Sequence, residues 1–216
     1  MKIEILYPEI CTLYGDKGNT MYLQKCLPDA EFVTTGLNEK PLFLKENIDM
    51  VYMCSMSEKS QELVLDRLMQ YKDEIAACMK DGKALFLLVG NSMELLGDYI
   101  KREDGTRVTG LGVVPGMYSV RQTPNRFNTL IKAKFNDMTL IGYTSRFAHT
   151  YGIPDDMTFC KVEIGQGSNP DTMNEGICKN RVIATYIHGP LLIQNPDFVH
   201  YLLEKLDAPI DRKSVV

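Results

Sequence analysis

The sequence has no tryptophan, and its six cysteines include no Cys-x-x-Cys pair. They are scattered along the chain without an accompanying histidine cluster, so neither a zinc site nor a disulfide framework is predicted, and no cofactor is expected. Most should be buried thiols, because an unpaired cysteine behaves as a small hydrophobic residue. The six are Cys11, Cys26, Cys54, Cys78, Cys160 and Cys178.

Long hydrophobic runs are also missing. No run approaches the ~20 residues that a membrane-spanning helix needs. The first seven residues enter a strand-like pattern directly, without the apolar stretch and cleavage site of a secretion signal. We therefore expect a cytoplasmic protein with no membrane span.

An excess of positive charge is absent too. The formal net charge is −4 and no basic stripe is present, which argues against nucleic acid as a partner. Hydrophobic residues make up 44% and charged residues 24%, so the composition is that of a folded globular protein rather than a disordered one. With 216 residues and no linker, residues 1–216 are expected to form a single domain.

The first half of the chain reads as a parallel α/β arrangement. Four runs rich in Ile, Leu, Val, Phe and Tyr predict strands that are buried on both faces. Apolar residues spaced three and four apart predict one helix that Ser57 caps and Gly82 closes. Strand, helix and strand in this order imply a right-handed parallel crossover. The four strands are expected at residues 2–7, 31–35, 48–54 and 84–89.

From about residue 108 glycine and proline punctuate the chain, and closely spaced strands follow. No long helix separates them, so an antiparallel extension of the sheet is expected. A final helix should begin with Asn195 as its cap and Pro196 in its first turn. The later strands are expected at residues 126–135, 138–144, 159–164 and 182–187.

Gly90 occupies a position that suits a nucleophile. The apolar run 85–89 stops at this glycine and a polar segment follows, which predicts a buried strand that breaks into a helix. Such a turn exposes its first residue at the top of the sheet, facing the positive end of the helix, where an acyl-transfer nucleophile can be activated. Here that residue has no side chain.

His188 lies just past the end of a predicted strand and before a Gly-Pro turn. Catalytic groups of open α/β sheets gather at the carboxyl ends of strands, so His188 should lie near Gly90 if their two strands are parallel neighbours. A purely structural role for a single histidine stays open. His200 falls within the final helix and is expected at the surface or in packing, and His149 is placed in an irregular loop without a role.

Four segments, in order along nearly the whole chain, carry a resemblance. The segments are Leu6-Tyr7-Pro8 with residues 14–19, the strand 48–52, the turn 89–97, and a closing set of residues 165–169, 175–176 and 185–196 that includes His-Gly-Pro-Leu-Leu. They match those of class I glutamine amidotransferases of the cobyric acid synthase (CobB/CobQ) branch. Within this branch the chain most resembles the GatD type, the glutaminase subunits of lipid II isoglutaminyl synthase.

The resemblance implies a flavodoxin-like α/β fold, with a central, mostly parallel sheet flanked by helices and an antiparallel extension. It also implies glutamine as a possible ligand, a Mur-ligase-like ATP-dependent subunit as the partner in a heterodimer, and a role in peptidoglycan amidation. In active relatives a cysteine attacks the glutamine amide, a histidine moves the proton, and backbone amides stabilise the oxyanion.

Carried over to this sequence, the resemblance places His188 as the histidine and Gly90 where the cysteine belongs. Asn91 replaces a glycine beside it, and Cys54 and Ser55 stand in the loop that carries Gly-Gly-Gly-Gln-Asp in relatives. Arg126 matches an arginine that holds the substrate carboxylate, a task suited to a guanidinium, although a solvated strand-edge arginine remains open.

Two more segments bear on the site. The Glu-Asn-His segment of relatives becomes Thr144-Ser145-Arg146, so it departs from the pattern. Asp16 is retained, but an aspartate in a Gly-flanked turn often caps backbone amides, and that alternative stays open.

These changes favour a naturally degenerate site over an engineered substitution, because loss of a nucleophile alone costs on the order of a millionfold in rate and would not explain the altered loop. We expect a partner-binding subunit without glutaminase activity. An active glutaminase subunit that supplies ammonia for lipid II amidation is the alternative, and a glutamine or amino-acid sensor that uses Arg126 and His188 is a further one. Cys54 is the only candidate for a substitute nucleophile, and a buried or incidental thiol is the other interpretation of this residue.

Overall fold

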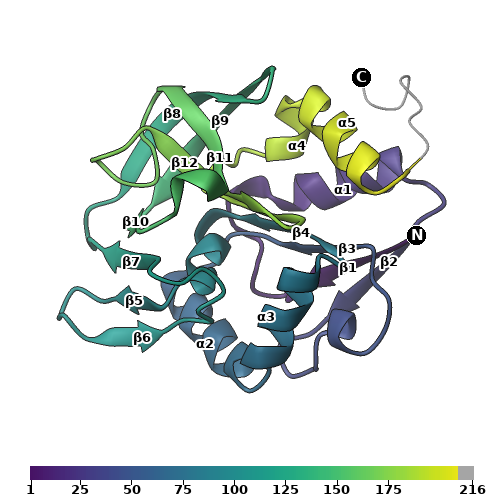
Figure 1. Ribbon diagram of the computed structural model, residues 1–216, viewed down its shortest axis with the longest axis horizontal. Coiled ribbons are helices and arrows are strands. Elements are labelled where there is room, and N and C mark those ends of the chain that lie inside the picture. The colour runs from purple at the N-terminus through teal and green to yellow at the C-terminus, as the bar shows by residue number, and fades with distance from the viewer. Residues whose placement is uncertain (209–216) are drawn as a thin grey trace.

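The structure is a computed structural model that describes residues 1–208. Over these residues a nine-stranded sheet forms the centre of the molecule, and a four-stranded sheet packs at one side of it (Figure 1). The strand order of the large sheet is β2-β1-β3-β4-β13-β12-β11-β8-β9. The first four strands follow the order of a doubly wound α/β fold, whose ligand sites lie at the carboxyl ends of the strands.

The parallel part of the large sheet contains the strands that carry the candidate site. Strand β13 pairs in parallel with β4, with Thr185 opposite Val89, so the loops after these two strands leave the sheet side by side. The parallel strands are β1 (Lys2–Leu6), β2 (Glu31–Thr35), β3 (Met50–Met53), β4 (Leu85–Val89) and β13 (Val182–Thr185).

The rest of the large sheet is antiparallel, which confirms the expected extension. A tight turn at Asn180 and Arg181, both with positive φ, reverses the chain between β12 and β13. The antiparallel strands are β8 (Phe127–Phe135), β9 (Met138–Arg146), β11 (Thr158–Ile164) and β12 (Asn174–Lys179).

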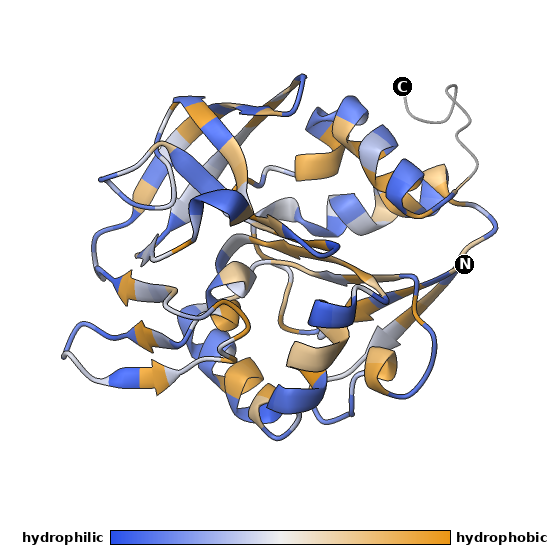
Figure 2. Cartoon of the chain, viewed as in Figure 1, coloured by the Kyte–Doolittle hydropathy of each residue, from blue (hydrophilic) through white to orange (hydrophobic). Residues whose placement is uncertain are grey.

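Helices cover both faces of the large sheet (Figure 1). Helices α1 (Lys17–Cys26), α4 (Leu191–Gln194) and α5 (Pro196–Lys205) lie on one face, and α2 (Glu58–Met69) and α3 (Lys72–Asp81) lie on the other. Figure 2 shows the apolar central strands between helices whose hydrophobic and hydrophilic residues alternate, as amphipathic packing requires. No helix within residues 1–208 is long and apolar enough to cross a membrane.

The single helix expected between Ser57 and Gly82 is in fact two helices. Ser57 caps α2 through its side chain, which accepts a bond from the Ser60 amide, and Gly82 closes α3 in the left-handed conformation, as expected. The break lies at Gln70 and Tyr71, where the Tyr71 backbone leaves helical geometry. Apolar spacing continues across the break, so the sequence pattern did not reveal it.

Asn195 occupies the N-cap position of α5, but its side chain does not cap the helix. Its amide oxygen instead accepts a bond from the Ile141 amide, and its NH₂ group donates to the Ile141 and Leu191 carbonyls. The residue therefore joins α4 and α5 to the edge strand β9. The expected capping role was wrong because a tertiary contact takes the side chain.

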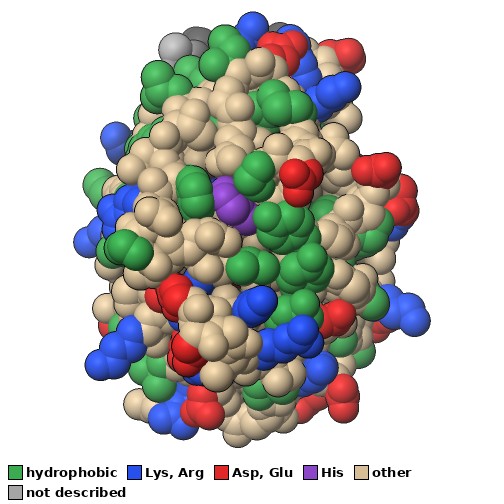
Figure 3. All heavy atoms as spheres, turned by 90° about the vertical axis from the view of Figure 1, so that its left-hand side faces the viewer, with side chains coloured by type: hydrophobic (Ala, Val, Ile, Leu, Met, Phe, Trp, Pro, Cys, Tyr) green, Lys and Arg blue, Asp and Glu red, His purple; other side chains and the backbone are tan. Residues whose placement is uncertain are grey.

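The small sheet was not expected as a separate unit. Its order is β10-β7-β5-β6, and it places His149 in a strand rather than in an irregular loop. Figure 3 shows the side of the molecule on which this sheet lies: a histidine side chain is visible among hydrophobic side chains, and charges of both signs surround them. The strands are β5 (Tyr99–Lys101), β6 (Arg107–Thr109), β7 (Tyr118–Arg121) and β10 (Ala148–Tyr151).

Candidate functional site

Four loops meet at the carboxyl ends of the parallel strands, and each contributes one residue to a buried cluster. Asp16 lies in the connection that leads from β1 into α1, Ser55 follows β3, Gly90 follows β4 and His188 follows β13. All four are buried. The sequence motifs that are far apart along the chain are thus brought together by strand order alone.

Gly90 lies in the left-handed region with φ +70°, in the sharp turn that a nucleophile position requires. It is buried, not exposed, and the segment that follows is the 3-10 helix η3 (Gly90–Leu96) rather than an α-helix. A Cβ atom at residue 90 would lie 2.0 Å from Ser55 Oγ and 2.8 Å from Ser55 Cβ. Ser55 therefore occupies the space into which a cysteine side chain at residue 90 would extend.

The 3-10 helix results from contacts that only the folded chain makes. The Asn91 amide group accepts a bond from the Met56 amide at 3.0 Å and donates to the Met56 carbonyl at 2.8 Å. Glu94 is buried and accepts bonds from the Gln61 side chain and the Tyr186 hydroxyl, both at 2.9 Å. These bonds hold the turn after β4 against the Ser55 loop, so Asn91 supports the loop and its amide is already paired.

A chain of hydrogen bonds runs from Asp16 through Ser55 to His188. Asp16 Oδ2 accepts bonds from Ser55 Oγ at 3.0 Å and from the Ser55 amide at 3.3 Å. Ser55 Oγ also lies 3.3 Å from His188 Nδ1. The other carboxylate oxygen of Asp16, Oδ1, accepts a bond from the side-chain Nδ2 of Asn19 at 3.4 Å. The sequence left open that Asp16 caps backbone amides. Asp16 does accept a bond from a backbone amide, but this amide belongs to Ser55 in the loop after β3.

The bonds of His188 fix which ring nitrogen carries the proton. The Ser145 amide donates to Nε2 at 2.9 Å, so Nε2 holds the lone pair and the neutral ring carries its hydrogen on Nδ1. Nδ1 then donates to Ser55 Oγ, and the Ser55 hydroxyl donates to Asp16. The nitrogen that faces Ser55 is therefore a donor, whereas a general base at this point must present a lone pair.

Two tyrosine rings cover the imidazole. The ring centroid of Tyr14 lies 4.4 Å from that of His188, and the centroid of Tyr143 lies 4.9 Å away. His188 is 1% exposed as a result. Backbone bonds between Tyr143 and His188 in both directions keep the loop after β13 against β9. This arrangement shields the histidine from water.

Burial shifts the pKa values of the two titratable groups in opposite directions. It raises the pKa of Asp16 to about 7, although hydrogen bonds from the Ser55 amide and hydroxyl oppose the shift. Burial, followed by the positive charge of Arg146, lowers the pKa of His188 to about 4. His188 is therefore neutral at physiological pH.

Cys54, the alternative nucleophile considered from sequence, lies beside this cluster but not in it. Its thiol hydrogen-bonds to the Cys11 carbonyl, and burial followed by the Asp16 charge raises its pKa above the usual range. Its neighbour Ser55, rather than Cys54, contacts His188. A reactive thiol needs a lowered pKa and a base within reach, so this geometry speaks against Cys54 in that role.

Arg126 lies outside the cluster. Its side chain is exposed, with the guanidinium carbon 4.5 Å from the centroid of the Phe147 ring, and it takes no part in the bonds that join Asp16, Ser55 and His188. Sequence reasoning did not single out the tyrosine cover or the orienting role of Ser145. A departure from the family pattern at residues 144–146 was the one signal that pointed to Ser145.

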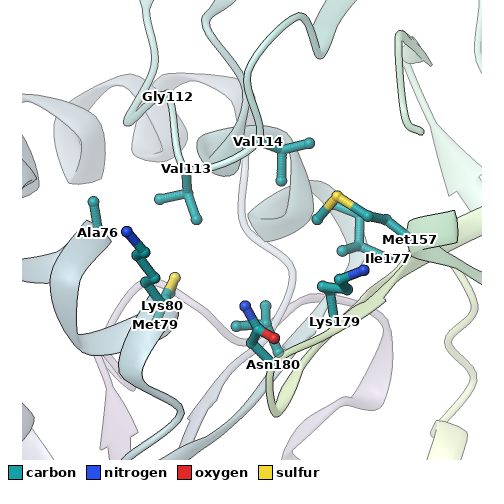
Figure 4. A pocket seen from close by; sticks show the side chains of 11 residues that line it. Ala76, Met79, Lys80, Gly112, Val113, Val114, Met157, Ile177, Lys179 and Asn180 are labelled. Atoms are coloured by element: carbon teal, nitrogen blue, oxygen red, sulfur yellow. The ribbon is translucent and has the colours of Figure 1, made fainter.

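Cavities lie elsewhere in the described structure. One of about 210 Å³ lies near the amino ends of β4 and β13, where Lys80 and Lys179 line it with Val113 and Met157 (Figure 4). Another of about 300 Å³ is lined by Cys11, Lys17 and Cys54. Neither is lined by Ser55, Gly90 or His188. Within residues 1–208 no group of three His, Cys, Asp or Glu side chains is placed to hold a metal ion.

Two curated proteins are similar to this chain along most of its length. The lipid II isoglutaminyl synthase (glutamine-hydrolyzing) subunit GatD of Streptococcus pneumoniae is 27% identical over 207 residues, which cover 94% of this chain and 79% of that protein. The subunit of the same name from Staphylococcus aureus is 27% identical over 195 residues, 89% of this chain and 79% of that protein.

Solved structures share the fold at low sequence identity. PurLQS from Thermotoga maritima matches with a TM-score of 0.61 and 13% identity, covering 87% of this chain and 86% of that one. A glutamine amidotransferase from the same organism matches with a TM-score of 0.57 and 13% identity, covering 99% and 90%. Residues 2–196 match the CobB/CobQ-like glutamine amidotransferase domain. The chain belongs to the CobB/CobQ-like glutamine amidotransferase family.

Proposed function

We propose that this chain is a GatD-type subunit that does not hydrolyse glutamine and acts by binding a Mur-ligase-like, ATP-dependent amidating subunit. The observation that carries the proposal is the position of Ser55. Its hydroxyl fills the space that a nucleophilic cysteine at residue 90 would need, and hydrogen bonds to Asp16 and His188 hold it there. The nucleophile is therefore absent and its place is occupied.

The histidine supports the same conclusion. Catalysis of amide hydrolysis needs a base that accepts the proton of the nucleophile. The lone pair of His188 is taken by the Ser145 amide, and Tyr14 and Tyr143 cover the ring. A glutamine side chain would have to displace these groups before it reached the imidazole. Such closure also speaks against use of the pocket as an amino-acid sensor.

The partner is inferred from the relatives. Both curated proteins are named as subunits of a glutamine-hydrolyzing lipid II isoglutaminyl synthase, and this chain matches them over about nine-tenths of its length. In this proposal the two subunits form a heterodimer in the cytoplasm. The ligase subunit then takes ammonium from solution, or responds to the bound subunit allosterically, to amidate a peptidoglycan precursor.

The complex of this chain with the Mur-ligase-like protein of the same genome tests the proposal. We expect a stable complex that amidates lipid II with ammonium as nitrogen donor and not with glutamine, and no release of glutamate from glutamine. Glutamine hydrolysis that disappears in His188→Ala or Cys54→Ala would contradict the loss of activity. Failure of the two proteins to associate would contradict the partner-binding role.

A second candidate is hydrolysis through Ser55 itself, and one observation favours it. Ser55 Oγ donates to Asp16, whose pKa of about 7 suits a base at neutral pH. Its burial, at 1% exposure, speaks against it. Diazo-oxo-norleucine, a reactive glutamine analogue, distinguishes the candidates: we expect no labelling, whereas a modified Ser55 found by peptide mass spectrometry, absent in Ser55→Ala, would establish the second candidate.

A further inference from the structure

Three large hydrophobic side chains are exposed together on one face of the antiparallel part of the sheet. Leu130 in β8 is 76% exposed, Ile164 at the end of β11 is 60% exposed and Ile141 in β9 is 48% exposed. Single exposed hydrophobic residues are common on protein surfaces, but a contiguous group often marks an interaction site. We call these three residues the outer-face patch.

Strand register makes the patch contiguous. Lys132 in β8 lies opposite Ile141 on one side and opposite Ile164 on the other. Directly opposite residues have Cβ atoms about 4.5–5.5 Å apart, and residues two apart on a strand share a face. Leu130 therefore lies beside the same row. The ammonium of Lys132 is drawn to Glu163 at 3.0 Å, which leaves its aliphatic stem between the two isoleucines.

The outer edge of β9 cannot pair with a strand of a partner protein. Asn195 occupies the amide and the carbonyl of Ile141, His188 occupies those of Tyr143, and the His188 ring accepts the amide of Ser145. A partner strand cannot add to an edge whose hydrogen-bonding groups are already paired. Association at this end of the sheet must use the side-chain face.

The positive charges beside the patch indicate what kind of partner surface fits it. Lys134 and Lys161 lie opposite each other in the register of β8 and β11, both are exposed, and neither forms an ion pair within the described residues. The Lys134 ammonium donates to Thr139 Oγ1 at 2.7 Å, so both lysines present positive charge without an acidic partner in residues 1–208, and an acidic partner surface would complement them. A two-fold contact between copies of this chain would instead bring like charges into one interface.

We propose that the outer-face patch is the surface on which the Mur-ligase-like subunit docks. The partner would place an apolar centre on the patch and acidic side chains against the rim that Lys134 and Lys161 form on this chain. The proposal rests on the partner-binding function given above. It places the partner beside the covered histidine, because Leu130 lies opposite Tyr143, whose ring packs on His188. The docked subunit would thus contact the strand that holds the closed site.

Substitutions that leave the core untouched test the surface. Leu130→Asp and Ile164→Asp place charge in the apolar centre, and Lys134→Glu with Lys161→Glu reverses the rim without altering the centre. Leu63→Asp is the matched control, because Leu63 is 40% exposed on α2, which covers the opposite face of the sheet. Thermal melting of each variant, compared with that of the unaltered chain, verifies that it is folded.

Affinity for the purified ligase-like subunit is measured by calorimetry. We expect about a tenfold or greater rise in Kd for the patch and rim variants, as for residues at the centre of an interface, and no change for Leu63→Asp. Unaltered affinity in both sets of variants would overturn the docking surface while the proposed function stands. No binding by the unaltered chain would overturn both.

Two other occupants of the patch, a second copy of this chain and a membrane surface, would give different experimental results. A dimer of the chain alone in light scattering that Leu130→Asp converts to monomer would overturn the partner assignment in favour of self-association. Binding to vesicles of phosphatidylglycerol and phosphatidylcholine that the rim variants abolish would overturn it in favour of a membrane surface. We expect a monomer and no vesicle binding.

Discussion

At the scale of single residues, the missing side chain at Gly90 and the hydroxyl of Ser55 belong to one structural arrangement. Gly90 leaves a space, and Ser55 Oγ fills it with bonds to Asp16 and His188 on either side. The Ser55 side chain leaves no room for a side chain at residue 90, and a side chain at residue 90 would leave no room for that of Ser55. A cysteine at residue 90 therefore requires a change at residue 55 as well.

Gly90→Cys alone should destabilise the protein by roughly 1–3 kcal/mol, the usual cost of overpacking, and should confer no glutaminase activity. In the double variant with Ser55→Gly the two substitutions should couple favourably, by more than about 0.5 kcal/mol relative to their sum. Urea denaturation of the unaltered chain, both single variants and the double variant measures this. Additive effects, or a fully stable Gly90→Cys, would show that Ser55 does not fill the site.

Asp16 gives the cluster a pH dependence that Asp16→Asn removes. Its folded pKa of about 7 exceeds the unfolded value of 3.8, so the stability it contributes is present below about pH 4 and lost as pH rises through 7. His188, with a pKa lowered to about 4, acts in the opposite sense: its contribution is present above the unfolded value of 6.5 and lost as pH falls through about 4.

Because the contributions oppose each other, the difference between two chains is the useful quantity. The free energy of unfolding of the unaltered chain minus that of Asp16→Asn should fall as pH rises from about 4 to 7, with a slope of up to about 1.4 kcal/mol per pH unit. Urea denaturation in steps of half a pH unit provides the curve. A difference that is flat, or rises with pH, would rule out a buried carboxyl with a raised pKa.

At the scale of elements, eight of the nine strands of the central sheet could be predicted because their sequence pattern is local, whereas β12 was not expected. The range 31–35 matches β2, and residues 84–89 and 126–135 each extend one residue beyond β4 and β8. Elements set by distant contacts could not be predicted. The 3-10 helix after Gly90 depends on bonds from Asn91 to Met56 and from Gln61 to Glu94, which link positions some 30 residues apart.

The location of the site could be predicted from the sequence, but its detailed geometry could not. Family motifs and the parallel pairing of β4 and β13 brought His188 into the neighbourhood of Gly90. The filled space was not predictable, because the Ser55 hydroxyl reaches it only when β3 and β4 align in the folded sheet. The tautomer of His188 depends on the Ser145 amide, and a backbone donor leaves no trace in the sequence.

The Asn195 contact with β9 predicts how this edge of the sheet is stabilised. Asn195→Ala removes both bonds to Ile141 and should cost roughly 0.5–1.5 kcal/mol, because the part-buried amide and carbonyl of Ile141 lose their partners. Hydrogen exchange at the Ile141 amide should accelerate more than exchange at Leu140, a buried neighbour in the same strand. Equal acceleration at both amides would indicate general loosening instead of loss of this contact.

At the scale of the whole molecule, one carboxylate ties the small sheet to helix α2, which covers one face of the large sheet. Glu62 in α2 bonds Arg102, just after β5, at 2.8 and 2.9 Å, and bonds Arg121 in β7 at 2.6 Å. Arg121 is 7% exposed, so its charge depends on this partner. The bonds from Arg102, followed by those from Arg121, lower the pKa of Glu62 to about 2, although partial burial opposes the shift.

Glu62→Gln should lower the free energy of unfolding by on the order of 1–3 kcal/mol at neutral pH, because Arg121 stays buried without a carboxylate. Since the folded pKa of Glu62 is depressed, its contribution is present above the unfolded value of 4.5 and lost as pH falls through about 2. The free energies of unfolding of the unaltered chain and of Glu62→Gln should therefore differ most above pH 5 and converge in acid.

Asp66→Asn, which removes an exposed surface pair with Arg67, is the control and should have little effect. If Glu62→Gln left stability and hydrogen exchange in β5 and β7 unchanged, the ion pairs of Glu62 would be incidental to the fold.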